Sequence, residues 1–372
     1  MKKVIKPLLS IIKDLENFGK ICIKERDIKY TYHLFLFHLL WETKYGQKIV
    51  KKLDSLKLFY PVFIEVEVTT RCNLKCIICE HTYWKEPIRD MTFEEFKLIV
   101  DQFPSLCWIG LTGIGESFLN KDFLKMLEYV KKKKVFIELY DTFYFINKEI
   151  AQRVVDLKVE RIFASIDAAK KETYEKIRVG SNFERVISNV ETLFKIKKEK
   201  NSKYPMVNFH FIVNKINYNE IPEFIEMVDK IRHGFQTEIQ FTRMLHNFPE
   251  IKDLFIEVPL HIIKEAEKIA KRKGINLIWN QNVPLKKPSI KDCTAWSMPF
   301  IFVNGDVICC CASNEANKRD FQKKYSFGNI FEKPFKKIWF SENYKNFRKQ
   351  IRLGKVPIQC IDCPIFEIWI KK

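Results

Sequence analysis

Glycine is scarce in this chain, which has 11 glycines in 372 residues. A content this low argues against long flexible linkers between domains. Long apolar runs are also missing, because no uncharged stretch reaches the roughly 18 residues that a transmembrane helix requires. The most apolar stretch, residues 30–41, is shorter and predicts a buried or interfacial helix. We therefore expect no membrane-spanning segment.

The N-terminus lacks the pattern of a signal peptide, because charged residues interrupt its first apolar run early. We therefore expect a cytoplasmic protein in a reducing compartment. In that setting the 11 cysteines predict metal sites rather than a disulfide framework.

Basic residues outnumber acidic ones, 65 to 46, and give a net charge of +19. Such a charge favours an anionic partner, namely nucleic acid, a membrane surface, or a phosphorylated or carboxylated substrate. A lysine-rich genome also accounts for it. The lysine run at residues 131–134 ends a predicted helix, where lysines complement the helix dipole, so we do not expect nucleic acid as a partner.

Residues 1–60 are basic, amphipathic and predicted to be helical. Two interpretations remain open for this extension. It forms a helical cap on the rest of the chain, or it makes peripheral contact with a membrane surface and admits a lipid-like substrate. In the second case the protein is membrane-associated.

Apolar segments alternate with amphipathic helices between residues 61 and 280. The expected strands cover residues 63–68, 107–111, 135–140, 161–166, 207–213 and 238–241. A predicted helix follows each of them, over residues 92–103, 121–133, 147–157, 183–198, 221–231 and 260–273. Six strand–helix units predict an α/β fold, a partial (β/α)6 TIM-like barrel, with its active site at the carboxyl ends of the strands.

Residues 281–372 have a different pattern. The dipeptide Asn304-Gly305 predicts a β-hairpin, a helix is expected over residues 333–352, and a Cys-x-x-Cys pair lies near the end. We therefore expect three parts: a helical extension (1–60), a barrel core (61–280), and a small C-terminal domain of a hairpin and a helix (281–372).

Cys72, Cys76 and Cys79 follow the first expected strand with Cx3Cx2C spacing. Three thiolates on one short loop can bind three irons of a [4Fe–4S] cubane and leave the fourth iron open to a ligand. A structural zinc site with His81 as fourth ligand is the alternative. The position directly after the first strand of a βα series favours the cluster.

On this motif and its position, residues 61–279 resemble the radical S-adenosylmethionine (SAM) superfamily. The resemblance implies that the open iron chelates the amino and carboxylate groups of SAM. It also implies that one electron from the reduced cluster cleaves SAM to a 5′-deoxyadenosyl radical, which abstracts a hydrogen from the substrate. The electron would come from a reductant such as a ferredoxin or flavodoxin.

A second motif after the second strand supports the resemblance. Gly113, Gly115 and Glu116 are similar to the family's Gly-Gly-Glu segment, which receives the SAM amino group. The family's usual proline after the glutamate is replaced by Ser117. After the third strand many relatives have Thr-Asn-Gly, where this chain has residues 140–143 (YDTF), so the pocket there is not expected to be built in the usual way.

The family pattern implies further SAM-binding residues. Ser165 and Asp167 are similar to a Ser-x-Asp pair that faces the ribose or carboxylate of SAM, and a helix N-cap is the alternative for Asp167. Arg178 is matched to a contact with the SAM carboxylate, and a solvated arginine is the alternative. Ile78, within the cysteine motif, is also expected to contact SAM.

A second group of six cysteines lies in the C-terminal part: Cys293, Cys309, Cys310, Cys311, Cys360 and Cys363. Their order resembles the SPASM/twitch extension of radical SAM enzymes. The resemblance implies one auxiliary [4Fe–4S] cluster on Cys293, Cys310, Cys360 and Cys363, and structural zinc on the same four is the alternative. If the cysteine run is a strand, Cys309 and Cys311 face away from Cys310, so the ligand within the run stays open.

The two resemblances together imply a radical SAM oxidoreductase or bond-forming enzyme whose auxiliary cluster accepts or relays an electron. Its substrate is a small molecule, a peptide or a lipid-like compound. A maturase of a ribosomal peptide is one alternative, and a non-enzymatic zinc or electron-transfer protein is another. The latter has no use for a glycine-rich turn that ends in Glu116.

Overall fold

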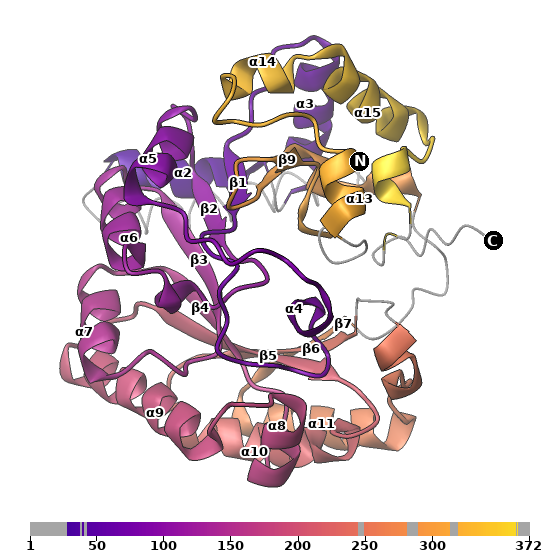
Figure 1. The fold of residues 1–372 in the computed structure, drawn as a ribbon. Helices are drawn as coiled ribbons and strands as arrows, with labels where there is room; N and C mark the ends of the chain where they lie inside the picture. The colour runs from indigo at the N-terminus through magenta and orange to yellow at the C-terminus, as the bar shows by residue number, and fades with distance from the viewer. Residues whose placement is uncertain are drawn as a thin grey trace, which may run out of the picture.

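The computed structural model describes residues 28–37, 39–40, 43–244, 249–280, 289–312, 319–361 and 363. Within them, seven parallel strands form a curved sheet in chain order. These are β1 (Phe63–Val66), β2 (Trp108–Leu111), β3 (Phe136–Asp141), β4 (Arg161–Ser165), β5 (Met206–Val213), β6 (Glu238–Arg243) and β7 (Asn276–Asn280). The sheet is curved and does not close into a full barrel (Figure 1). The expected partial α/β barrel is confirmed.

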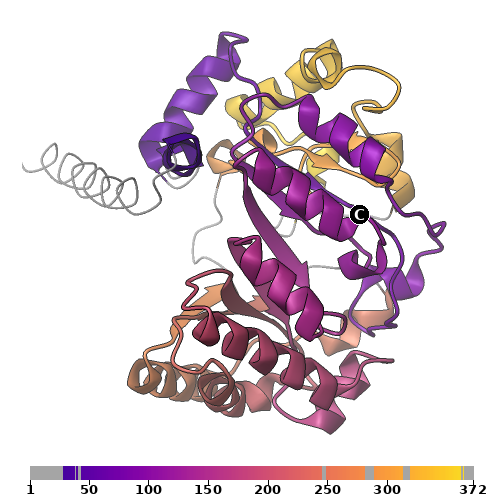
Figure 2. The same cartoon turned by 90° about the vertical axis from the view of Figure 1, so that its left-hand side faces the viewer.

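Six long helices cover the convex face of this sheet (Figures 1 and 2). They are α5 (Phe93–Asp101), α6 (Phe123–Lys132), α7 (Lys148–Asp156), α9 (Phe183–Glu199), α10 (Ile221–Ile231) and α11 (Leu260–Lys273). Local sequence explains where several begin. Thr92 and Glu95 form the expected capping box of α5, and the Asn147 side chain accepts the Ile150 N–H at the start of α7.

Side chains alternate between the two faces of each strand. On β3, Ile137 and Leu139 are buried in the main apolar core, which lies between the sheet and the helices. Glu138 and Tyr140, with the opposite parity, face the concave side. The concave face is therefore left to polar and aromatic side chains, which are suited to binding a ligand.

The sheet is larger than the six strands that the sequence predicts. The strand β7 was not expected, and the hairpin of β8 (Phe300–Ile301) and β9 (Val307–Ile308) adds to the other edge. The hairpin itself is confirmed, but β8 pairs in parallel with β1, which a local turn signal could not reveal. The boundary near residue 280 stays a prediction, although one sheet runs across both parts.

The expected helix over residues 333–352 is two helices, α14 (Phe335–Trp339) and α15 (Glu342–Leu353). Ser341 separates them, because its hydroxyl accepts the Tyr344 N–H and starts a new helix. Three shorter helices were not expected: α4 (Glu80–Tyr83), α8 (Lys171–Ile177) and α13 (Arg319–Lys324).

The described part of the N-terminal extension packs on the core. It contains α2 (Ile28–Phe37) and α3 (Lys44–Ser55). His33 Nδ1 of α2 lies 2.8 Å from the carbonyl oxygen of Lys134, just before β3. This packing favours the helical cap. The expectation that residues 1–60 make peripheral contact with a membrane gains no support from it, and residues 1–27 of that segment lie outside the described residues. Among the described helices, none combines the length and the apolar character needed to cross a bilayer.

Candidate functional site

The loop after β1 carries the three cysteines of the first group. Backbone hydrogen bonds attach this loop to the segment that ends α8. Lys75 N donates to Val179 O at 2.8 Å, and Ile77 N donates to Ile177 O at 2.9 Å. Two separate parts of the chain therefore hold the cysteine loop at the carboxyl end of the sheet.

Cys76 is buried, and Cys72 and Cys79 are partly buried, in an apolar cluster at the mouth of the barrel. The buried neighbours in that cluster are Leu74, Ile78, Ile177, Met244 and Ile251. Burial raises the pKa of all three thiols, that of Cys76 to about 12. The site therefore holds neutral thiols until a metal centre binds, because the thiolate is the ligand form.

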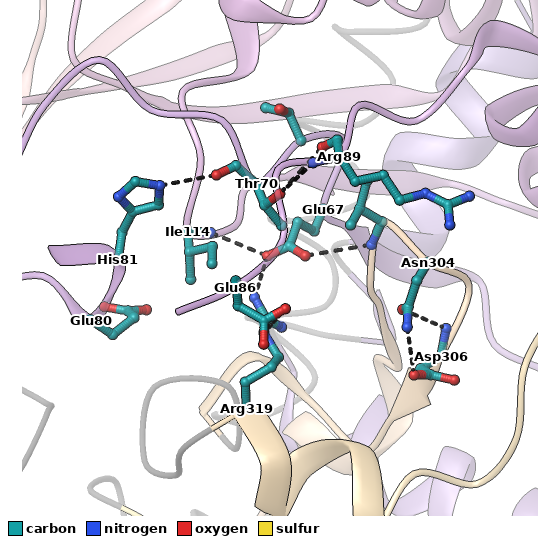
Figure 3. A network of polar contacts seen from close by, with 12 residues as sticks. Glu67, Thr70, Glu80, His81, Glu86, Arg89, Ile114, Asn304, Asp306 and Arg319 are labelled. Carbon is teal, nitrogen blue, oxygen red and sulfur yellow. Dashed lines mark hydrogen bonds and ion pairs between the residues drawn. The ribbon is translucent and has the colours of Figure 1, made fainter. Parts of the chain in front are cut away.

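Thr70 ties the two ends of the cysteine loop together (Figure 3). Its hydroxyl oxygen accepts the Arg89 N–H at 2.9 Å, and its carbonyl oxygen lies 3.0 Å from His81 Nε2. The ring of His81, the fourth ligand in the zinc alternative, thus contacts the backbone of the loop. Among the residues that the structure describes, no three His, Cys, Asp or Glu side chains converge on a single ion position.

The turn after β2 packs directly against the cysteine loop. The Glu116 N–H donates to the Arg71 carbonyl oxygen at 2.8 Å. A Cβ on Gly115 would lie 2.3 Å from the carbonyl oxygen of Thr69, so a side chain there would push the turn away from the loop. Gly113 and Gly115 are thereby brought together with the cysteines, as the sequence predicts.

Glu116 and Asp141 form a pair of buried carboxyl groups beside this turn. The Thr142 hydroxyl donates to Glu116 Oε2 at 2.7 Å. Burial and the charge of Glu116, against which it lies, raise the pKa of Asp141 well above its usual range. Glu116 Oε1 and Asp141 Oδ2 have no other hydrogen-bond partner among the described residues. The raised pKa favours a proton on Asp141, and the free oxygens of the pair can accept a cationic group such as an ammonium.

Residues 140–143, which replace the family's Thr-Asn-Gly, form a tight turn at the end of β3. Phe143 has φ 59°, in the left-handed region that favours glycine, and its N–H donates to Asp141 Oδ1 at 2.6 Å. This tight turn therefore carries the carboxyl group of Asp141. Only the tertiary structure shows that this carboxyl group meets Glu116.

Asp167 and Arg178 pair with each other at the ends of β4 and α8. Asp167 Oδ2 lies 2.6 Å from Arg178 Nη2, and Oδ1 accepts the Ile212 N–H at 2.7 Å. Arg178 is 7% exposed, so the alternative of a solvated arginine is wrong. The N-cap of α8 is Lys170, so Asp167 does not cap that helix either. Burial raises the pKa of Cys76, and the charge of Arg178 offsets part of that rise, which places Arg178 beside the cysteine loop.

The concave face beside this pair carries aromatic residues that the sequence did not single out. Tyr140 stacks on Phe163 at a centroid distance of 4.6 Å, and the ring of His210 meets Tyr140 edge-on at 5.5 Å. His210 Nε2 lies 3.0 Å from Thr242 Oγ1, and burial lowers the pKa of His210 to about 4. Strand parity was the available signal, because Tyr140, Phe163 and Ser165 all take the inward positions.

The C-terminal cysteines gather at one end of the main apolar core. Cys293, Cys309, Cys310, Cys360 and Cys363 belong to that core, whereas Cys311 packs with a separate cluster around Phe302. The expectation that Cys309 and Cys311 share a face is wrong, because β9 ends at Ile308 and the cysteine run is not a strand. Burial, with the neighbouring Cys310 thiol, raises the pKa of Cys293 to about 12.

Comparison with known families identifies both parts of the site. Residues 66–228 match the pattern of the Radical SAM superfamily, and residues 293–364 match that of an iron–sulfur cluster-binding domain of the SPASM type. The chain therefore contains a radical SAM domain followed by a SPASM domain. This radical SAM enzyme therefore has a [4Fe–4S] cluster and SAM as cofactors, and its C-terminal domain is an auxiliary iron–sulfur domain.

Two curated relatives span most of this radical SAM enzyme. A tungsten-containing aldehyde ferredoxin oxidoreductase cofactor-modifying protein of Pyrococcus furiosus is 27% identical over 320 residues, 82% of this chain and 87% of its own length. An AdoMet-dependent heme synthase of Methanosarcina barkeri is 25% identical over 314 residues, 78% of this chain and 84% of its own.

Solved structures agree on the fold. SuiB of Streptococcus suis bound to SAM has a TM-score of 0.63 at 15% identity, covering 91% of this chain and 79% of its own. The enzyme anSMEcpe with bound AdoMet has a TM-score of 0.59 at 16% identity, covering 79% of this chain and 81% of its own.

Proposed function

We propose that this enzyme cleaves SAM reductively at a [4Fe–4S] cluster held by Cys72, Cys76 and Cys79, and then oxidises its substrate or forms a bond in it. The observation that carries the proposal is the hydrogen bond from Glu116 N to Arg71 O, at 2.8 Å. It holds a buried carboxyl pair beside three clustered thiols. When bound, the reduced cluster supplies the electron for SAM cleavage.

The residues around the thiols fit the two charged ends of the methionyl group. Glu116 and Asp141 would accept the SAM ammonium on their two oxygens that have no other partner. Arg178 would pair with the SAM carboxylate, and Asp167 would hold Arg178 in place.

Smaller groups complete this pocket. Gly113 and Gly115 allow SAM and the cysteine loop to approach the turn. Ile78 is buried next to the cysteines and would give the pocket an apolar wall. Ser165, at the carboxyl end of β4, would face the ribose.

One auxiliary [4Fe–4S] cluster on Cys293, Cys310, Cys360 and Cys363 would serve electron transfer. Four protein ligands leave no iron open to substrate, so the cluster's role would be to accept or relay an electron. Cys309 is a second candidate for the ligand from the cysteine run, because it lies beside Cys360. There it offsets part of the rise that burial and the other thiols cause in the pKa of Cys360. An electron acceptor of this kind favours a net oxidation or bond formation.

For the substrate we infer a small, ring-containing molecule of the cofactor type. The two relatives that span most of the chain are named for work on a cofactor and on heme. The stacked rings of Tyr140 and Phe163 offer a flat surface on the concave face. A peptide or a lipid-like substrate, and a ferredoxin or flavodoxin as reductant, stay predictions.

Anaerobic incubation of the reconstituted protein with SAM and dithionite tests the proposal. We expect 5′-deoxyadenosine to form, and to be lost in Cys76→Ala. Iron analysis should give about eight irons per chain, as two cubane clusters require. Zinc in place of iron, or 5′-deoxyadenosine formation that survives Cys76→Ala, would contradict it.

A further inference from the structure

A buried ion pair joins the strand before the cysteine loop to the C-terminal domain. Glu67 follows β1, and Arg319 begins α13. The Arg319 Nη2 atom lies 2.7 Å from Glu67 Oε2, and the two residues are 3% and 1% exposed (Figure 3). A pair this deeply buried is held in place, because either charge alone would be costly in a low-dielectric interior.

Glu67 also supports the turn that would receive the SAM ammonium. Its Oε2 accepts the Ile114 N–H at 3.3 Å, and its Oε1 accepts the Val303 N–H at 3.4 Å. A Cβ on Gly113 would lie 2.5 Å from the Glu67 Cγ atom, so the glutamate stem packs directly on the turn. The backbone contacts are long, and the short contact of Glu67 is the one with Arg319.

Arg319 in turn contacts the segment that leaves the cysteine loop. Its guanidinium stacks on the Phe302 ring at 3.9 Å and lies 5.8 Å from the Trp84 ring. Arg319 Nε is 3.9 Å from Glu86 Oε2, and Lys323, on the same helix, pairs with Glu86 at 3.1 Å. One arginine of the auxiliary domain therefore touches the supports of both the turn and the cysteine loop.

We propose that Arg319 is a positioning residue for SAM: through Glu67 it fixes the turn at Gly113 and Ile114 relative to the cysteine loop. The auxiliary domain must then be docked for the core to bind SAM tightly. Without Arg319, the Glu67 carboxylate would be left buried with only two long backbone hydrogen bonds and would move away from the turn. The inference rests on the proposed function, in which this turn receives the SAM ammonium.

Arg348 provides a matched control for Arg319. It is 2% exposed, its Nε lies 2.7 Å from Asp54 Oδ1, and its guanidinium stacks on Trp339 at 3.8 Å. It thus has the same kind of carboxylate and aromatic partners in the same C-terminal domain. It packs against α3, however, and not against the turn or the cysteine loop.

The test measures the SAM dissociation constant of the reconstituted full-length protein by equilibrium dialysis, per mole of intact clusters. We expect Arg319→Met to raise the constant at least tenfold and Arg348→Met to leave it within twofold, although both lower the unfolding temperature. The electron paramagnetic resonance change that SAM produces in the reduced cluster should weaken only in Arg319→Met. Equal effects of the two variants, or none from Arg319→Met, would overturn the inference.

Glu67→Gln tests the route through Glu67 and serves if Arg319→Met does not fold. The glutamine side chain can still accept the backbone hydrogen bonds, but it lacks the charge that pairs with Arg319. We therefore expect a several-fold weaker affinity for SAM, a smaller loss than in Arg319→Met. Arg319→Lys is combined with Glu67→Gln to test whether the two residues act through one contact. In the Glu67→Gln background, Arg319→Lys should raise the SAM dissociation constant by a smaller factor than it does in the wild type. An equal factor in both backgrounds would contradict the route through Glu67. If the wild type itself did not bind SAM, the proposed function would fail, and this inference with it.

Discussion

At the scale of single residues, the site has a pair of buried carboxyl groups at one point and a buried arginine at another. The carboxyl groups of Glu116 and Asp141 are buried together at one point of the site. Arg178 is buried at another, with Asp167 as its partner. In the proposed function, the ammonium of SAM would meet the first pair and its carboxylate would meet Arg178, so that each end of the ligand faces a group of the opposite charge.

The first residue-scale prediction concerns Asp141→Asn. Burial raises the pKa of Asp141, so the native state binds a proton more tightly than the unfolded chain. Wild-type stability therefore falls as pH rises above the ordinary aspartate range, and the variant should escape that loss. We expect Asp141→Asn to unfold at a higher temperature than wild type at pH 8, with a smaller difference at pH 5, and to bind SAM more weakly. A variant that loses stability at pH 8 would contradict this.

The second residue-scale prediction concerns His210. Its pKa is lowered to about 4, so between about pH 6.5 and 4 the unfolded chain takes up a proton that the native state refuses. Stability should drop by about 1 to 3 kcal/mol as pH falls through that range. Urea unfolding of His210→Gln should show a shallower drop, and an unchanged pH profile would rule out this residue as the source.

At the scale of elements, the hairpin of β8 and β9 connects the two iron–sulfur regions. It extends the barrel sheet at β1, the strand that leads into the first cysteine loop. It also leads into the run at Cys309 and Cys310. The shape of one short turn therefore matters to both regions.

Gly305→Ala should disturb that turn. Gly305 has φ 90°, and a Cβ there would lie 2.4 Å from Phe331 and 2.5 Å from Asn329 Oδ1. We expect a loss of about 1 to 3 kcal/mol and fewer than the full set of irons per chain. Gly274→Ala is the control, since Gly274 also has positive φ, at 64°, but has nothing within 4 Å. It should cost about 1 kcal/mol or less and keep its iron. Equal iron loss in both would refute the packing argument.

At the scale of the whole molecule, the C-terminal domain is held to the N-terminal extension as well as to the core sheet. Trp339 Nε1 donates to the Phe59 carbonyl oxygen at 2.9 Å, just before β1. Arg348 pairs with Asp54 of α3. These contacts lie away from the cysteine loop, so loss of the auxiliary cluster alone should leave the core folded.

We therefore expect the double variant Cys360→Ala/Cys363→Ala to keep SAM cleavage and to lose product formation. The double variant should lose about four irons per chain, the content of one cubane. It should still form 5′-deoxyadenosine from SAM, because the three core cysteines are intact, but it should yield no oxidised or newly bonded product. Product formation at the wild-type rate would remove the electronic role of the auxiliary cluster.

The sequence alone determined the barrel class, the cysteine loop and the glycine turn. These features depend on local periodicity and on short spacings, which chain neighbours alone can specify. The structure places Cys72, Cys76 and Cys79 in one apolar cluster, and Cys293, Cys310, Cys360 and Cys363 in the main core. The exact ligand sets remain predictions.

Tertiary structure alone decided the contacts between distant segments. The Asp141–Glu116 pair, the Arg319–Glu67 pair and the place of β8 on β1 join residues far apart in the chain. No local pattern encodes such contacts, since they depend on how helices and strands pack. The same limit explains the cysteine run, where strand parity failed because the strand ends at Ile308, before the first of its cysteines.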